Sequence, residues 1–282
     1  MKKITRRSFM AAAGLTVAAL ALTACGGSSS TASSAAASSV ASSAAASSEA
    51  ASAAATELTT VEAGKLTMAT NAAFPPYEMT TDAGEFEGID IETAQAIADK
   101  LGLELQIDDM DFDAALLSVQ QGKADIVMAG VTVTDERKAV MDFSDSYATG
   151  IQSIIVPEGS DIASPDDLAG KKIGTQRGTT GYIYCSDDFG DDAVVAYDNG
   201  LTAVQALNNG QVDAVVIDNA PAQEFVAANP GLKVLDTSYA EEDYAIGMAK
   251  GSSLEAAVNA ALEELKADGT LQAIVDKYIT AE

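Results

Sequence analysis

The sequence lacks two residue types altogether and is poor in a third. The 282-residue chain has no histidine, no tryptophan and only two cysteines, Cys25 and Cys185. Without histidine, a Ser-His-Asp triad, a Cys-His dyad and the common zinc sites are all excluded. One cysteine is assigned below to a lipid, so no disulfide framework is available. We expect the other, Cys185, to be a small buried side chain.

Basic residues are also scarce. The chain has 16 Lys and Arg against 42 Asp and Glu, which gives a formal net charge of -26. Such a surface repels phosphate backbones, so nucleic acid is excluded as a partner. We expect the negative charge to serve solubility.

No metal or cofactor is predicted. The acidic stretch 109–113 begins like a calcium loop, but Ala114 and Gln120 stand where that loop needs Gly and Glu. The glycine-rich stretch 174–181 lacks the Gly-Lys-Ser/Thr ending of a nucleotide-binding loop.

Residues 1–25 have the features of an export signal. Basic residues from Lys2 to Arg7 precede an apolar run, 11–22, that is too short to span a bilayer permanently. The run ends in Leu-Thr-Ala-Cys25, which resembles the lipobox of bacterial lipoproteins and implies that Cys25 carries the lipid. The paired arginines also resemble the twin-arginine motif, so the export route stays open.

Residues 26–60 are predicted to be a disordered tether. They are almost all Ser, Ala, Gly and Thr, with nothing large to bury. About 30 such residues reach roughly 30 Å, enough for a folded domain to move above a membrane. The tether is similar to those of Gram-positive lipoproteins, so we expect the protein to be exported and lipid-anchored to the outer face of such a cell membrane.

From Lys65 onward, short strands alternate with amphipathic helices. The patterns predict strands at 66–70, 103–107, 125–129, 151–156, 172–175, 194–197, 212–217, 233–235 and 244–248. They predict helices at 89–101, 113–121, 134–141, 179–186, 201–208, 220–228, 252–267 and 270–278. This order indicates an α/β fold with parallel sheets covered by helices. Two such blocks predict two lobes, 62–148 plus 243–282 and 152–238, with hinges near 147–151 and 239–243.

Three segments directly follow predicted strands, where ligands of open α/β sheets bind. They are 70–78 (TNAAFPPYE), 129–137 (AGVTVTDER) and 174–181 (GTQRGTTG). Together with Asp218 they resemble family 3 of the bacterial extracellular solute-binding proteins, which bind polar amino acids. The resemblance runs over 65–278. It implies a two-lobed periplasmic-binding-protein fold with a hinge and a central ligand cleft, a monomer without cofactor, and delivery of an amino acid to the permease subunits of an ABC transporter.

The chemistry of an amino acid accounts for the residue types in these segments. Its carboxylate and ammonium both need partners when buried, because an unpaired buried charge is costly. The resemblance assigns the carboxylate to Arg137, which can grip it with two parallel hydrogen bonds. Thr132 and the backbone amides at Thr179 and Thr180 would add donors at a helix N-terminus.

The same resemblance assigns the ligand's ammonium to Asp218 and to the carbonyl of Gly130, with Ala129 beside it. By itself, Asp218 is also a candidate N-cap ahead of Pro221. Phe74 and Phe112 match the family's aromatic clamp, although core packing is an alternative for both.

Asn71 and Gln176 match positions at which members of this family contact the ligand side chain. Both are uncharged, so we expect a neutral polar ligand such as glutamine. Glu78 and the acidic loop 108–113 would favour a cation if either reached the pocket.

Two other functions are compatible with this scaffold. One is a cleft enzyme of the prephenate-dehydratase type, but no catalytic carboxylate stands out. The other is a receptor's sensor domain, but no transmembrane helix or signalling domain follows in the sequence.

Overall fold

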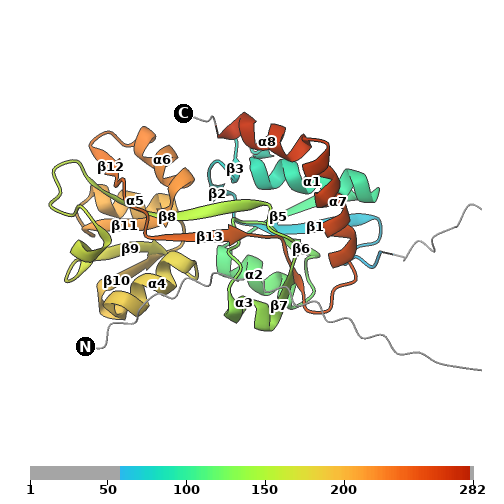
Figure 1. The fold of residues 1–282 in the computed structure, drawn as a ribbon, viewed down its shortest axis with the longest axis horizontal. Helices are drawn as coiled ribbons and strands as arrows, with labels where there is room; N and C mark the ends of the chain where they lie inside the picture. Colours follow the sequence, from blue (N-terminus) through green and yellow to red (C-terminus); the bar gives the residue numbers. More distant parts are fainter. Residues whose placement is uncertain (1–57, 280–282) are drawn as a thin grey trace, which may run out of the picture. The chain divides into compact units, whose positions relative to one another are not determined.

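The computed structural model describes residues 58–279. The predicted signal, Cys25 and nearly all of the predicted tether lie outside the described residues. Within 58–279, helices flank two mixed β-sheets (Figure 1). No helix in this range is both long and apolar enough to cross a membrane.

The first sheet has the strand order β5-β1-β6-β14-β7. Its bounds are β1 (Lys65–Thr70), β5 (Glu104–Asp109), β6 (Ile126–Val127), β7 (Met141–Phe143) and β14 (Gly247–Ala249). Five helices accompany it: α1 (Ile89–Leu101), α2 (Phe112–Gln120), α3 (Asp135–Val140), α7 (Glu255–Ala267) and α8 (Thr270–Tyr278). A small antiparallel sheet joins β2 (Ala73–Phe74), β3 (Glu78–Thr80) and β4 (Phe86–Glu87). We call these elements the first lobe.

The second sheet has the order β10-β9-β11-β8-β12, with β13 also paired to β8. Its bounds are β8 (Ala148–Pro157), β9 (Ile173–Gln176), β10 (Val194–Tyr197), β11 (Ala214–Asp218), β12 (Leu232–Val234) and β13 (Ala240–Tyr244). Its helices are α4 (Thr180–Phe189), α5 (Gly200–Asn208) and α6 (Asn219–Ala228), with short 3-10 turns η1 (Pro165–Leu168) and η2 (Asp191–Ala193). These elements form the second lobe.

The chain crosses between the lobes twice, in two strands that run side by side. It passes into the second lobe through β8 and returns through β13, and the two are antiparallel, with Ala148 opposite Tyr244 and Gln152 opposite Ala240 (Figure 1). The predicted single strand 244–248 is therefore wrong. Tyr244 ends β13, whereas Gly247 begins β14 in the other sheet. The apolar run contributes to both sheets, because the backbone leaves β13 of the second sheet at Tyr244 and enters β14 of the first sheet at Gly247.

The prediction of purely parallel sheets is also wrong. β5, β1 and β6 are parallel, and so are β10, β9 and β11. However, β14 is antiparallel to β6, and β8 is antiparallel to β11. Both exceptions are the strands that follow a crossing, since the chain enters each sheet from the opposite end.

The core of each lobe lies between its sheet and its helices. In the first lobe, Leu66 and Met68 on β1 are fully buried in one cluster with Ile97 of α1 and Leu262 of α7. In the second lobe, Cys185 of α4 is fully buried in an apolar cluster, which confirms its prediction as a small core residue.

Candidate functional site

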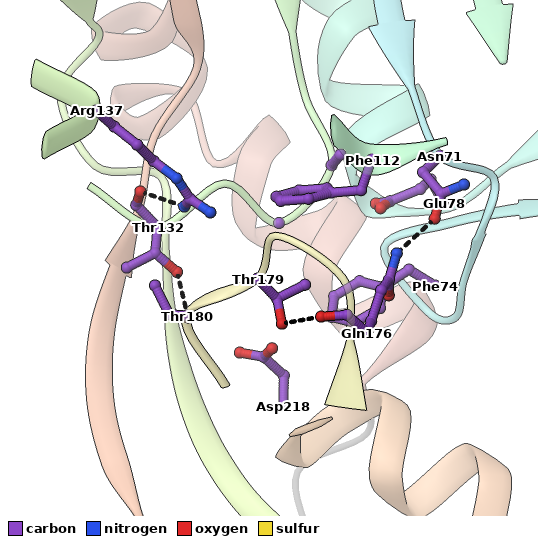
Figure 2. Close-up of a pocket in the computed structure, with 12 residues that line it drawn as sticks. Asn71, Phe74, Glu78, Phe112, Thr132, Arg137, Gln176, Thr179, Thr180 and Asp218 are labelled. Atoms are coloured by element: carbon purple, nitrogen blue, oxygen red, sulfur yellow. Dashed lines mark hydrogen bonds between the residues drawn. The ribbon is translucent and has the colours of Figure 1, made fainter. Parts of the chain in front are cut away.

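One pocket is lined by residues of both lobes (Figure 2). It gathers all eleven residues predicted to contact a ligand, together with Glu78. The lining residues are Asn71, Phe74, Glu78, Phe112, Ala129, Gly130, Thr132, Arg137, Gln176, Thr179, Thr180 and Asp218. Asn71 follows β1, while Gln176 and Asp218 end β9 and β11. The sheet order thus brings the carboxyl ends of strands from both lobes to one place.

Arg137 is held at the pocket by the start of α3. The Thr134 hydroxyl caps this helix by accepting from the Arg137 amide at 3.2 Å. The guanidinium donates from Nη1 to the Thr132 carbonyl at 2.7 Å and from Nη2 to the Gly178 carbonyl at 3.2 Å. Its Cζ lies 5.4 Å from the centroid of the Phe112 ring. Backbone contacts and the ring therefore fix the direction of the charge.

Arg137 is nearly buried, yet it has no ion-pair partner among residues 58–279. Burial lowers the pKa of its guanidinium, and the negative charge of Glu242 opposes this shift. Two of its five N–H groups are used, so the others remain for an anion. A buried cation without a partner is costly, and an anionic ligand would remove that cost.

Asp218 is the acidic counterpart of Arg137 in the pocket. It is the N-cap residue of α6, as the alternative interpretation placed it, but its side chain makes no capping bond. Its carboxylate instead accepts from Gln152 Nε2 at 2.8 Å and from the Tyr244 hydroxyl. Burial raises the pKa of Asp218 to about 7. A cationic group placed here would favour its charged form.

The hydroxyls of Thr132 and Thr180 line the pocket but are directed to an acid behind it. Thr132 Oγ1 donates to Glu242 Oε2 at 3.1 Å, and Thr180 Oγ1 donates to the same oxygen at 2.9 Å. The predicted role of Thr132 as a hydroxyl donor to a ligand carboxylate is not available while this bond is kept. Glu242 was missed in the sequence because the acidic run 241–243 looks like an exposed loop.

Asn71 and Gln176 contact each other across the two lobes. Gln176 Nε2 donates to Asn71 Oδ1 at 2.9 Å (Figure 2). Asn71 Nδ2 donates to the Met110 carbonyl at 2.9 Å. The two amides therefore satisfy part of each other's hydrogen bonding. Thr179 lies beside them, with its hydroxyl donating to the Gln176 carbonyl at 2.8 Å and capping α4.

Glu78 brings a carboxylate to the same end of the pocket. It is completely buried, and its only polar partner in the described part of the chain is the neighbouring Asp90 side chain. Burial first, and then the nearby Asp90 carboxylate, raise the pKa of Glu78 well above its ordinary value. The sequence could not place Glu78 here, because the two- and three-residue strands β2 and β3 that turn it inward have no periodic pattern.

Gly130 and Ala129 line the pocket through their backbone, and Gly130 packs against the rings of Phe74 and Tyr244. Gly130 has a φ of +55°, and a Cβ there would lie 2.9 Å from the Phe74 ring. Its amide donates to Asp90 Oδ2 at 3.0 Å, and the Tyr147 hydroxyl donates to Asp90 Oδ1 at 2.7 Å. Burial raises the pKa of Asp90 to about 6. Only glycine lets the backbone approach the ring this closely.

The pocket contains no arrangement that identifies a metal site. Within residues 58–279, no group of three or more Cys, Asp or Glu side chains is placed to hold a metal ion. The arrangement instead presents one buried cation, Arg137, opposite the buried acid Asp218, and a separate polar end that holds a second buried acid, Glu78. These are complementary to a small zwitterion with a polar side chain.

Known proteins are similar to this chain in sequence and in fold. The chain is 34% identical over 226 residues to the L-cystine-binding protein TcyJ of Escherichia coli strain K12, covering 78% of this chain and 85% of the relative. The structure of an ancestral arginine-binding protein bound to glutamine matches with a TM-score of 0.75 at 42% identity, covering 78% of this chain and all of the other. An ancestral arginine-binding protein bound to arginine matches with a TM-score of 0.73 at 43% identity, covering 77% and 98%.

The family model of the bacterial extracellular solute-binding proteins, family 3, matches residues 66–281. This match covers both lobes and every residue of the pocket. The two-lobed architecture is that of the periplasmic binding proteins, as the sequence predicted. The chain therefore belongs to family 3 of the bacterial extracellular solute-binding proteins, and it is a non-enzymatic substrate-binding protein of the amino-acid ABC transporter type.

Proposed function

We propose that this protein captures one L-α-amino acid in the pocket between its lobes and delivers it to the permease of an ABC importer. The observation that carries the proposal is the pair Arg137 and Asp218, a buried cation and a buried acid that line one pocket without pairing with each other. An α-amino acid supplies a carboxylate for Arg137 and an ammonium for Asp218. One ligand thus pairs with both charges, each of which is costly to bury without a partner.

Closure of the two lobes explains how such a ligand is held. Arg137 and Asp218 belong to different lobes, so both charges are satisfied only when the lobes are together. The hinges are proposed at 147–151 and 239–243, in the paired crossing strands β8 and β13. The mobile units would be 62–148 plus 243–282 and 152–238. A ligand that contacts both units shifts the population toward the closed form.

The ligand side chain would meet Asn71, Gln176 and Glu78. The two amides favour a neutral polar side chain such as that of glutamine. Glu78 adds a carboxyl group whose only polar neighbour among residues 58–279 is Asp90, and it favours N–H donors, above all a guanidinium or ammonium that keeps the carboxylate charged. The two ancestral structures above hold glutamine and arginine, whereas the relative from Escherichia coli is an L-cystine-binding protein. We therefore propose a ligand whose side chain ends in N–H donors, with a cationic side chain ranked above glutamine.

A thermal-shift screen of the twenty amino acids, followed by calorimetry, tests this function. A tight ligand raises the melting temperature by mass action. We expect arginine and then glutamine to give the largest shifts, and arginine amide, which lacks the carboxylate, to give none. If no amino acid shifts the melting temperature, the proposed function is wrong.

The N-terminal residues supply the second half of the proposal. The lipobox at 22–25 and the Ser/Ala-rich stretch 26–60 support an exported protein that is tethered by lipid at Cys25 outside the cell. Cys25→Ala should abolish incorporation of labelled fatty acid while ligand binding stays unchanged. Label still entering this variant would exclude the anchor.

A further inference from the structure

Glu242 is a buried carboxylate outside the set of pocket-lining residues, and one of its oxygens collects donors from both lobes. It lies on β13 and is 7% exposed. Its Oε2 accepts from Thr132 Oγ1 at 3.1 Å, from Thr180 Oγ1 at 2.9 Å and from Gln152 Nε2 at 3.0 Å. Its Oε1 accepts none of these bonds, but the Tyr184 hydroxyl of α4 also lies against this carboxylate. Three donors to a buried charge therefore meet at a single atom.

These donors belong to opposite sides of the pocket. Thr132 follows β6 of the first lobe and forms a backbone bridge to Tyr244, whereas Thr180 begins α4 of the second lobe. Gln152 lies on β8, the crossing strand paired with β13. Thr132 and Thr180 can reach the same oxygen only when the lobes are together. Opening removes at least one charge-assisted hydrogen bond from Glu242.

The bonds also fix the direction of the two hydroxyl protons. A threonine hydroxyl has one proton, and both threonines give it to Glu242. What Thr132 and Thr180 can present to the pocket is then their lone pairs. Lone pairs suit an ammonium rather than a carboxylate. The carboxylate of a ligand is left to Arg137 and the backbone amides at the start of α4.

We infer that Glu242 is a positioning residue that stabilises the closed pocket and turns the Thr132 and Thr180 hydroxyls into acceptors for the ligand. The inference rests on the proposed function for the ligand's identity. The effect of Glu242 on closure does not, because the three hydrogen bonds join groups of the protein itself. Glu242 acts through Thr132 and Thr180, since they line the pocket and it does not.

The test compares Glu242→Gln with Glu241→Gln, a matched change one residue away on the exposed face of the same strand. Glutamine keeps the size of the side chain and one accepting oxygen but removes the charge. Spin labels at Leu117→Cys on α2 and Ile183→Cys on α4, both exposed, report the distance between the lobes. Cys25→Ser leaves only these two sites to label, since Cys185 is buried.

In the empty protein, we expect Glu242→Gln to move the distance distribution toward longer distances and Glu241→Gln to leave it unchanged. In stopped-flow experiments with arginine, Glu242→Gln should raise the dissociation rate about tenfold or more, since closed-state hydrogen bonds to a charge are lost. An unchanged distance distribution in a folded variant would overturn the closure role. The distance measurement needs no ligand, so it still tests the closure role of Glu242 if no amino acid binds. The closure role and the proposed function can therefore be contradicted independently.

A double-mutant cycle separates positioning from general stability. Thr132→Val keeps the shape of the side chain but removes the hydroxyl. If Thr132 is oriented by Glu242, this change should raise the dissociation rate in the wild-type background and have little further effect in the Glu242→Gln background. Additive effects in the two backgrounds, with melting temperatures showing both proteins folded, would show that the hydroxyl works independently and overturn the positioning role.

Discussion

The two ends of the pocket differ in how their polar groups are satisfied. At one end, Arg137 and Asp218 have no opposite charge in ion-pair range among residues 58–279. At the other end, Asn71 and Gln176 hydrogen-bond to each other, and Glu78 has no partner in that range other than the Asp90 side chain. The first end requires any ligand to bring a carboxylate and an ammonium. The second end can accommodate different ligand side chains, and Glu78 decides which of them is favoured.

The largest effect should come from the charged end. Arg137→Ala should weaken binding of every amino acid by about 3–5 kcal/mol, because the ligand carboxylate would be buried without its partner. Calorimetry with arginine and glutamine measures the loss. The matched control is Arg177→Ala, which removes an exposed arginine paired with Asp198 and should leave affinity unchanged. Equal losses in the two variants would contradict the assignment.

Glu78→Gln should produce the next largest effect, and it should affect ligands unequally. Arginine binding should weaken by at least about 2 kcal/mol, since a buried cation loses its carboxylate. Glutamine binding should change little, so the ratio of the two affinities is the measurement. The control Glu87→Gln changes an exposed acid on β4, the strand paired with β3. An unchanged ratio of the arginine and glutamine affinities would contradict the role of Glu78 and favour a neutral ligand.

The pocket residues also differ in how far the sequence alone could place them. Arg137, Thr132 and Asp218 stand next to strand ends and capping signals, so their placement follows from local patterns. Glu78 and Glu242 reach the site through short strands and a change of sheet at residues 245–246. No local periodicity marks either feature. Sequence alone missed Glu242 and left open whether Glu78 reaches the pocket, because both placements depend on long-range strand pairing.

The pH dependence of stability should separate the buried acids of the pocket from those on the surface. Burial raises the pKa of Asp90 to about 6 and of Asp218 to about 7. The folded empty protein then binds more protons than the unfolded chain between about pH 4 and 7, so its stability should fall as pH rises through this range. Asp142 has a lowered pKa and acts the opposite way, but only below about pH 4.

Melting temperatures of the empty protein between pH 5 and 7.5 check this expectation, and Asp218→Asn should flatten the decline. A bound ammonium favours the charged form of Asp218, so the thermal shift given by a saturating ligand should grow as pH rises. A ligand-induced shift that shrinks over this range would mean that Asp218 does not face the ammonium.

The smallest effect should come from the amide pair. Asn71→Ala removes the hydrogen bond from Gln176 across the lobes and leaves the charged groups untouched. A neutral hydrogen bond contributes about 1 kcal/mol, so affinity should fall by roughly that amount for arginine and glutamine alike. Asn208→Ala is the control, because it removes a similar bond to Asn229 that is exposed and far from the pocket. A loss confined to glutamine would show instead that Asn71 reads the ligand side chain directly, and the two ends of the pocket would then be equally specific.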